Sequence, residues 1–183
     1  MSQLQKEKTH IDQMYENFDE CLKLLASEVS LKIEMDKQLK KVLLISSASF
    51  FEYEITQSIK IFTTKNTDAQ RLQQFVQTRA ISRQYHTYFE WKAKNANQFF
   101  KMFGVEFQKK VRQVIDDDGI LLDSEKSFME LGKERNILTH ENFGENETQK
   151  TLYEVYELYQ KAYQFTLFLK DSLNWNEEDY SKE

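Results

Sequence analysis

The sequence contains no proline and only four glycines in 183 residues. Proline breaks helix interiors and glycine marks turns and flexible linkers, so the chain has few points at which a long helix must stop. Its single cysteine, Cys21, excludes an intrachain disulfide, and no cysteine or histidine spacing matches a zinc or iron–sulfur site. We therefore expect neither a metal nor another cofactor, and we interpret Cys21 as an apolar packing residue.

Long apolar runs are absent as well. No stretch reaches the ~18 residues of a membrane span, and residues 1–6 lack the apolar core of a signal peptide. These absences predict a cytoplasmic protein with no membrane partner. With 40% hydrophobic and 30% charged residues, the chain has the composition of one globular domain. We assign residues 1–174 to that domain and residues 175–183 to an acidic C-terminal tail.

Apolar residues recur at helical spacing along most of the chain, and no segment shows the alternation of a strand. The spacing predicts long helices over residues 4–29, 34–65 and 147–173, shorter helices over 68–83, 87–103 and 106–115, and a helix from about 123 to 142–144. Asp123 and Ser124 suit the start of that last-named helix, and Asn142 and Gly144 suit its end. We therefore predict an all-α, single-domain bundle with long antiparallel helices.

The net charge is −5, but positive charge is concentrated in one region. Between Arg71 and Arg112, nine Lys and Arg residues stand against two acids, Glu90 and Glu106, so this segment carries +7 and the remainder −12. This distribution indicates either a basic nucleic-acid-binding face on an acidic body or a solvated helix surface. On the first interpretation, the binding residues are Lys92, Lys94, Lys101, Lys109, Lys110 and Arg112.

Aromatic residues accompany these cations. The whole chain contains 14 Phe and 9 Tyr, and the aromatic residues of the basic region are Tyr85, Tyr88, Phe89, Trp91, Phe99, Phe100 and Phe103. Aromatic rings beside positive charge could stack on unpaired bases. Aromatic rings at helical spacing also form hydrophobic cores, and both interpretations fit the sequence.

The segment Arg135-Asn136-Ile137-Leu138-Thr139-His140 carries the clearest chemical information. Arginine holds a phosphate with a planar, permanently charged fork, and histidine exchanges a proton near neutral pH. Together they supply the charge stabilisation and the proton transfer that metal-free RNA cleavage uses. At about 100° per residue, four polar residues form one arc of the helix, in the order Arg135, Thr139, Asn136 and His140. Leu131 and Leu138 lie on the other side and can pack inward.

The same geometry separates Arg135 from His140, because the two residues occupy opposite edges of the arc. Two copies of the helix, facing each other across a two-fold axis, would bring both pairs to one cleft. The alternative is a surface arginine and a C-terminal histidine favoured by the helix dipole. A looser spacing also admits Arg79 and His86, so spacing alone is a weak indicator.

The stretch Phe128–His140 resembles the defining helix of the HEPN superfamily, whose pattern is Arg, often Asn, then His. Three softer similarities to the RiboL-PSP-type HEPN proteins extend over most of the chain. They are Ser49–Glu52, Asn97–Gly104 and a last helix rich in Tyr and Phe.

This resemblance implies a helical bundle that dimerises through the motif helix and, in active members, a metal-independent endoribonuclease. It implies catalytic roles on RNA for Arg135, Asn136 and His140, with Thr139 in support. Glu52 could orient a site residue or be an ordinary surface acid. Such proteins typically act in bacterial toxin–antitoxin and anti-phage systems, which implies a cognate antitoxin or defence partner.

Two further functional classes stay open at this point. One is a non-catalytic HEPN-like module that binds RNA or protein, and the other is a plain helical adaptor. Some HEPN toxins carry a tyrosine two residues after the histidine as an AMPylation target. Asn142 stands there in this chain, which does not fit that mode of regulation.

Overall fold

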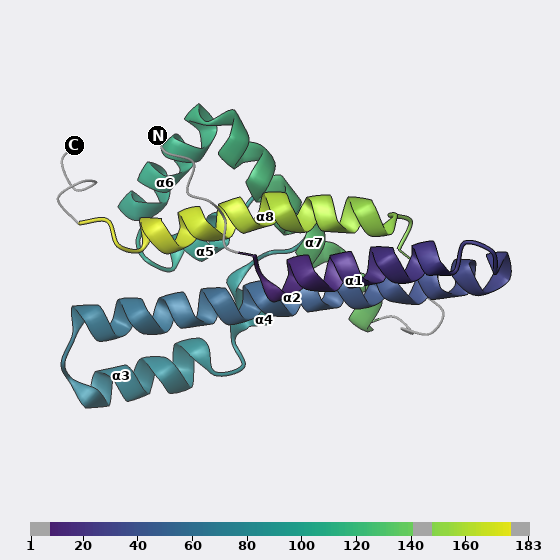
Figure 1. Cartoon of the computed structure of the whole chain (residues 1–183). Coiled ribbons are helices and arrows are strands. Elements are labelled where there is room, and N and C mark those ends of the chain that lie inside the picture. Colours follow the sequence, from purple (N-terminus) through teal and green to yellow (C-terminus); the bar gives the residue numbers. More distant parts are fainter. Residues whose placement is uncertain (1–7, 141–147, 177–183) are drawn as a thin grey trace.

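The computed structural model describes residues 8–140 and 148–176, and within these ranges every regular element is a helix (Figure 1). The predicted all-α class is confirmed. The scarcity of glycine and the absence of proline leave few helix breaks, and the longest element, α2 (Val29–Asn66), runs for 38 residues. Across the described residues, the helices carry too much polar sequence for any of them to traverse a lipid bilayer.

Helix α1 (His10–Leu24) lies along the first half of α2 in a hairpin (Figure 1). Thr9 begins α1 with a reciprocal cap, since its hydroxyl accepts from Asp12 N while the Asp12 carboxylate accepts from Thr9 N at 2.7 Å. The predicted boundaries at residues 29 and 34 were wrong. Leu24 and Val29 are 78% and 64% exposed, so apolar residues continue through the turn and conceal it. The predicted start at residue 4 lies outside the described part.

Helix α8 (Leu152–Ser172) packs against both α2 and α7 (Gly119–His140), and these three helices enclose the core (Figure 1). α8 begins later than predicted, because Thr151 and Glu154 form a capping box at its start. The side chains at the centre of the bundle are fully buried and come from all three helices. They are Leu43, Leu44, Phe51 and Ile55 of α2, Phe128 and Leu131 of α7, and Val155, Tyr159, Phe165 and Leu169 of α8.

Helix α7 begins at Gly119, earlier than the predicted start at Asp123 and Ser124. The carboxylate of Asp118 accepts from the backbone N–H groups of Ile120 and Leu121 at 2.8 and 3.1 Å, which satisfies two donors of the first turn. Ser124 instead lies inside the helix and is buried. The predicted end at residues 142–144 lies outside the described residues.

Shorter helices connect α2 to α7. They are α3 (Gln70–Val76), the π-helical turn η1 (Gln77–Ile81), α4 (Tyr85–Tyr88), α5 (Asn97–Lys101) and α6 (Val105–Asp117). The last of these agrees with the helix predicted over 106–115. The predicted helix over 68–83 is split between α3 and the π-helical turn.

The helix predicted over residues 87–103 is wrong, since residues 89–96 form a non-helical segment. Burial of aromatic rings outweighs the helical spacing here. Phe89 is 2% exposed and packs its ring 5.0 Å from that of Phe128 and 5.2 Å from that of Phe99. Most aromatic residues of the basic region are buried in the core, and Trp91 and Phe103 pack against it. These rings therefore attach the segment to α7 and serve as core.

Candidate functional site

Arg135 lies near the C-terminal end of α7, with 32% of its side chain exposed. Its Nη1 donates to Asn136 Oδ1 at 3.0 Å, and its Nη2 stands 4.0 Å from Glu52 Oε2 of α2. The contact with Glu52 is at the outer limit of an ion pair. The guanidinium is therefore held in place on one side and retains donors for an anionic ligand.

A small pocket opens beside Arg135 and Asn136. Its remaining walls come from α2, α4, the 89–96 segment and α7: Ala48, Phe51, Tyr85, His86, Trp91, Phe128, Leu131 and Gly132. The enclosed space has room for about one water molecule. Apolar walls exclude water and lower the local dielectric constant, so the charge of Arg135 acts more strongly here than on an open surface.

Gly132 allows this pocket to form. A Cβ atom at Gly132 would lie 1.9 Å from Trp91 Cζ3, inside van der Waals contact. The missing side chain lets the indole of Trp91 pack directly on the α7 backbone, one turn before Arg135. Trp91 also packs on Phe128, with ring centroids 5.7 Å apart. A glycine inside the motif helix thus fixes the non-helical segment beside the arginine.

The hydroxyl groups of two buried tyrosines, Tyr85 and Tyr88, are affected by the charge of Glu52. Burial raises the pKa of the Tyr85 hydroxyl, the charge of Glu52 raises it further, and Arg135 opposes the change. Burial and Glu52 raise the pKa of Tyr88 to about 12, and its hydroxyl donates to Ala80 O. Both hydroxyls stay protonated at neutral pH, so they can act as hydrogen-bond donors and not as bases.

The other predicted motif residues occupy different positions on α7. Thr139 is exposed, and its hydroxyl donates to the carbonyl oxygens of Arg135 and Asn136 at 3.0 and 3.4 Å. His140 is the last residue of α7, and its side chain lies outside what the structure describes. It is five positions after Arg135, which places the two backbone positions about 7.5 Å apart along the helix axis.

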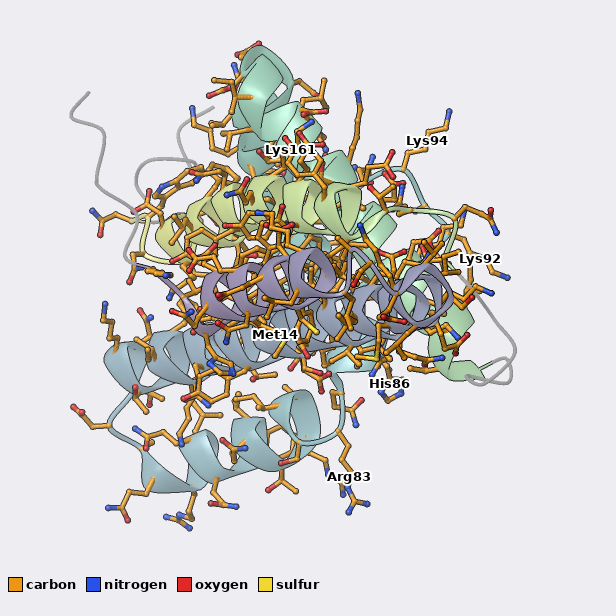
Figure 2. All side chains as sticks on the ribbon, turned by 45° about the vertical axis from the view of Figure 1, so that its right-hand side comes forward. Met14, Arg83, His86, Lys92, Lys94 and Lys161 are labelled. Carbon is orange, nitrogen blue, oxygen red and sulfur yellow. The ribbon has the colours of Figure 1, made fainter. Side chains whose placement is uncertain are left out.

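In the sequence, His86 is only a looser spacing match with Arg79, whereas the structure places it beside Arg135. It is exposed on α4 and lines the Arg135 pocket (Figure 2). Forty-nine positions separate it from Arg135, so no local spacing connects the two. Only the packing of Tyr85, Phe89 and Trp91 brings α4 to this end of α7.

The predicted basic face is divided in the structure. Lys92 and Lys94 are exposed on the segment that contains Trp91, and both lie above His86 in the view of Figure 2. Lys101 lies on α5, whereas Lys109 and Lys110 lie on α6, and none of the three lines a hollow beside Arg135.

Arg112 has a structural role. Its Nη1 donates to both carboxylate oxygens of Glu125 at 2.8 and 3.0 Å, and its Nη2 lies 2.9 Å from Asp116 Oδ1. Glu125 is 1% exposed and also accepts from Ala96 N at 3.0 Å. Arg112 is therefore not a free cation of the predicted face. It neutralises the buried carboxylate that anchors the 89–96 segment to α7.

Within residues 8–140 and 148–176, no group of three or more His, Cys, Asp or Glu side chains is arranged to hold a metal ion. The chemistry that the described residues offer is anion binding by Arg135, with Asn136 and Glu52 orienting it and the His86 imidazole at the pocket rim.

Comparison with known families gives one match. The family model described as RiboL-PSP-HEPN matches residues 8–174, which includes every helix described above. No curated protein and no solved structure matches the chain at a significant level.

Proposed function

The chain belongs to the RiboL-PSP-HEPN family, and from this membership we propose that it is a metal-independent endoribonuclease acting on RNA through the 2′-hydroxyl group. The observation that carries the proposal is the placement of Arg135. Its guanidinium stands at the rim of an apolar pocket, is oriented by Asn136 and Glu52, and precedes His140 by five residues on α7.

The reaction needs one nucleophile that RNA itself supplies. The 2′-oxygen attacks the adjacent phosphorus while His140 removes its proton, and the bond from phosphorus to the 5′-oxygen breaks. A second imidazole gives a proton to the departing 5′-oxygen. The products are a 2′,3′-cyclic phosphate and a 5′-hydroxyl end. Arg135 stabilises the negative charge that builds on the non-bridging oxygens during the attack.

We propose that the second imidazole comes from another copy of the chain. Arg135 and His140 are about 140° apart around α7, so one helix presents them in different directions. A homodimer that pairs its two α7 helices would place two arginines and two histidines around one phosphate. Ile137, between them in sequence, is 39% exposed and offers an apolar contact for such an interface.

Glu52 and Asn136 are positioning residues in this mechanism. Asn136 fixes one guanidinium nitrogen by a hydrogen bond, and the charge of Glu52 draws the other toward α2. Thr139 contributes less directly, because its hydroxyl donates to carbonyl oxygens of its own helix. From the family resemblance, we also propose a cytoplasmic role in a toxin–antitoxin or anti-phage system, with an antitoxin or defence protein as partner.

The experiment that tests this function is incubation of labelled RNA and a DNA of the same sequence with purified protein in EDTA. The proposal expects cleavage of the RNA alone, with cyclic phosphate ends, because DNA lacks the 2′-hydroxyl. RNA that is bound but left intact would indicate a non-catalytic HEPN module. A protein that neither binds nor cleaves RNA would indicate a helical adaptor.

A further inference from the structure

Two open hollows flank the Arg135 pocket and share residues with it. The lysine hollow, lined by Lys92, Lys94, Lys126 and Lys133, meets the pocket at Trp91. The Arg83 hollow, lined by Lys60, Gln77 and Arg83 together with Glu52, meets it at Tyr85. The three depressions therefore adjoin one another, with the Arg135 pocket between the two hollows.

The sizes of these spaces show where a ligand fits. The Arg135 pocket holds about one water molecule, so no base can enter it. On the same measure, which gives about 10 Å³ for the Arg135 pocket, the lysine hollow and the Arg83 hollow offer about 440 and 260 Å³. A polymer that reaches Arg135 with one phosphate must place its neighbouring nucleotides over the two hollows.

The lysine hollow has unbalanced positive charge. Within the described part of the chain, none of its four lysines has a carboxylate partner. Of its two acids, Glu130 pairs with Lys150, while Glu134 accepts from the Thr148 hydroxyl at 3.2 Å and keeps its charge, so the lysines outnumber the carboxylates of the hollow. Four cations around one hollow, unpaired with any carboxylate of residues 8–140 and 148–176, suit a phosphate backbone.

The Arg83 hollow carries positive charge at the opposite end. Lys60 and Arg83 are both exposed, and neither forms an ion pair with a described residue. Arg83 also has φ 60°, the single positive value among the described non-glycine residues, and it follows the π-helical turn η1. Left-handed backbone and π-helical turns are costly conformations that concentrate at functional sites.

Figure 2 shows the labelled members of this series. Lys94, Lys92, His86 and Arg83 follow one another in that order from the top of the view to the bottom, in its right-hand half. His86 belongs to the Arg135 pocket, Lys92 and Lys94 to the lysine hollow, and Arg83 to the hollow at the other end. The view agrees with the order given by the shared residues.

We infer that a single strand of RNA lies along this track, with the scissile phosphate at Arg135 and flanking phosphates held by the lysine hollow on one side and by Lys60 and Arg83 on the other. The inference rests on the proposed function and adds two flanking phosphate subsites to it. A single strand is required because the 2′-oxygen must rotate into line with the departing 5′-oxygen, which a regular A-form duplex prevents.

The test measures RNA binding separately from cleavage. His140→Ala protein, which the mechanism makes inactive, is titrated against a fluorescent single-stranded RNA of about 12 nucleotides, a length within the range of single-strand binding sites. Two double variants reverse the charge at the two ends of the track. Lys60→Glu with Arg83→Glu changes the Arg83 hollow, and Lys126→Glu with Lys133→Glu changes the lysine hollow. Lys101→Glu with Lys109→Glu is the matched control, since it changes net charge equally away from the track.

We expect each reversal on the track to weaken binding at least ~10-fold. The slope of the logarithm of affinity against the logarithm of salt concentration should become shallower by about 0.7 for each phosphate that is no longer neutralised. The control should bind as the parent does, and a duplex of the same sequence should compete poorly. Binding that is insensitive to Lys60→Glu with Arg83→Glu, or abolished equally in the control, would overturn the track.

A further variant distinguishes a loss of RNA binding from a loss of folding. Arg83→Gly removes the charge and relieves the positive φ, so its thermal unfolding temperature should not fall, while its affinity for RNA should. Unchanged affinity in Arg83→Gly would remove Arg83 from the site. If the parent protein cleaves RNA but no reversal affects binding, the track fails and the nuclease stands. If the reversals weaken binding but no protein cleaves RNA, the proposed activity fails and the track stands.

Discussion

Gly132 and Trp91 are packed so closely that a methyl group on Gly132 would lie 1.9 Å from the indole ring. The indole is fixed on its other sides, since its ring lies 4.9 Å from that of Phe89 and 5.9 Å from that of Tyr85. It cannot turn aside without disturbing the core. The glycine therefore determines where the 89–96 segment meets the arginine helix.

Gly132→Ala should lower the free energy of unfolding by about 1–3 kcal/mol, the usual cost of overpacking, despite the gain of up to ~1 kcal/mol in helix propensity. Gly119→Ala is the control in the same helix, because a Cβ at that position meets nothing within 4 Å. Urea unfolding measures both. A Gly132→Ala protein as stable as the parent would contradict the packing described here.

Glu125 is expected to be the carboxylate that stability depends on most, because it is buried and bonded to Arg112 and to Ala96 N. Glu125→Gln breaks the buried pair and leaves Arg112 with the more exposed Asp116 as its carboxylate partner, which should cost up to about 3–5 kcal/mol of unfolding free energy. Glu106→Gln, which removes the exposed partner of Lys109, should cost no more than ~1 kcal/mol. Equal effects in chemical denaturation would disprove a structural role for Glu125.

Glu52→Gln should change the RNA affinity and the rate of RNA cleavage in different ways. The change removes a negative charge near the phosphate site, so RNA affinity should stay the same or rise. The cleavage rate should fall between about tenfold and 10²-fold, because Arg135 loses the charge that orients it. Glu54→Gln is the control, since Glu54 pairs with Lys170 at 2.7 Å. A parental rate for Glu52→Gln in single-turnover kinetics would make Glu52 an ordinary surface acid.

Light scattering should give about twice the 22.0 kDa mass of one chain, because the mechanism needs two α7 helices. Ile137→Asp should shift the protein toward a monomer and reduce RNA cleavage with it. Ile120→Asp provides the comparison, since Ile120 is 74% exposed at the far end of the same helix. A parent protein that stays monomeric at high concentration would rule out a composite site.

The sequence was sufficient for the features that depend on local pattern. Helical spacing predicted the all-α class and the α6 and α7 helices, and the polar arc correctly places Leu131 and Leu138 in the interior. Helix ends were harder to locate. Asp118 and Asp123 are both good caps, and only the contacts of Asp118 show which one begins α7.

Features that arise from tertiary packing could not be predicted. Residues 87–103 have helical spacing, yet the buried Glu125 binds Ala96 N and Phe89 packs on α7, so the segment is not helical. The same packing brings His86 to Arg135. A count of charges grouped Arg112 with Lys92, whereas the first neutralises a buried acid and the second is exposed.

The most direct test of the central claim is the rate of RNA cleavage in EDTA by the parent protein, His140→Ala and Arg135→Lys. Loss of a general acid–base group usually lowers the rate ~10²–10⁴-fold, so His140→Ala should cleave RNA at a barely measurable rate. Arg135→Lys should also fail, because lysine keeps the charge but lacks the planar fork. The parent should leave 2′,3′-cyclic phosphate ends. Cleavage that requires Mg²⁺ and leaves 5′-phosphates, or that persists in both variants, would contradict the account.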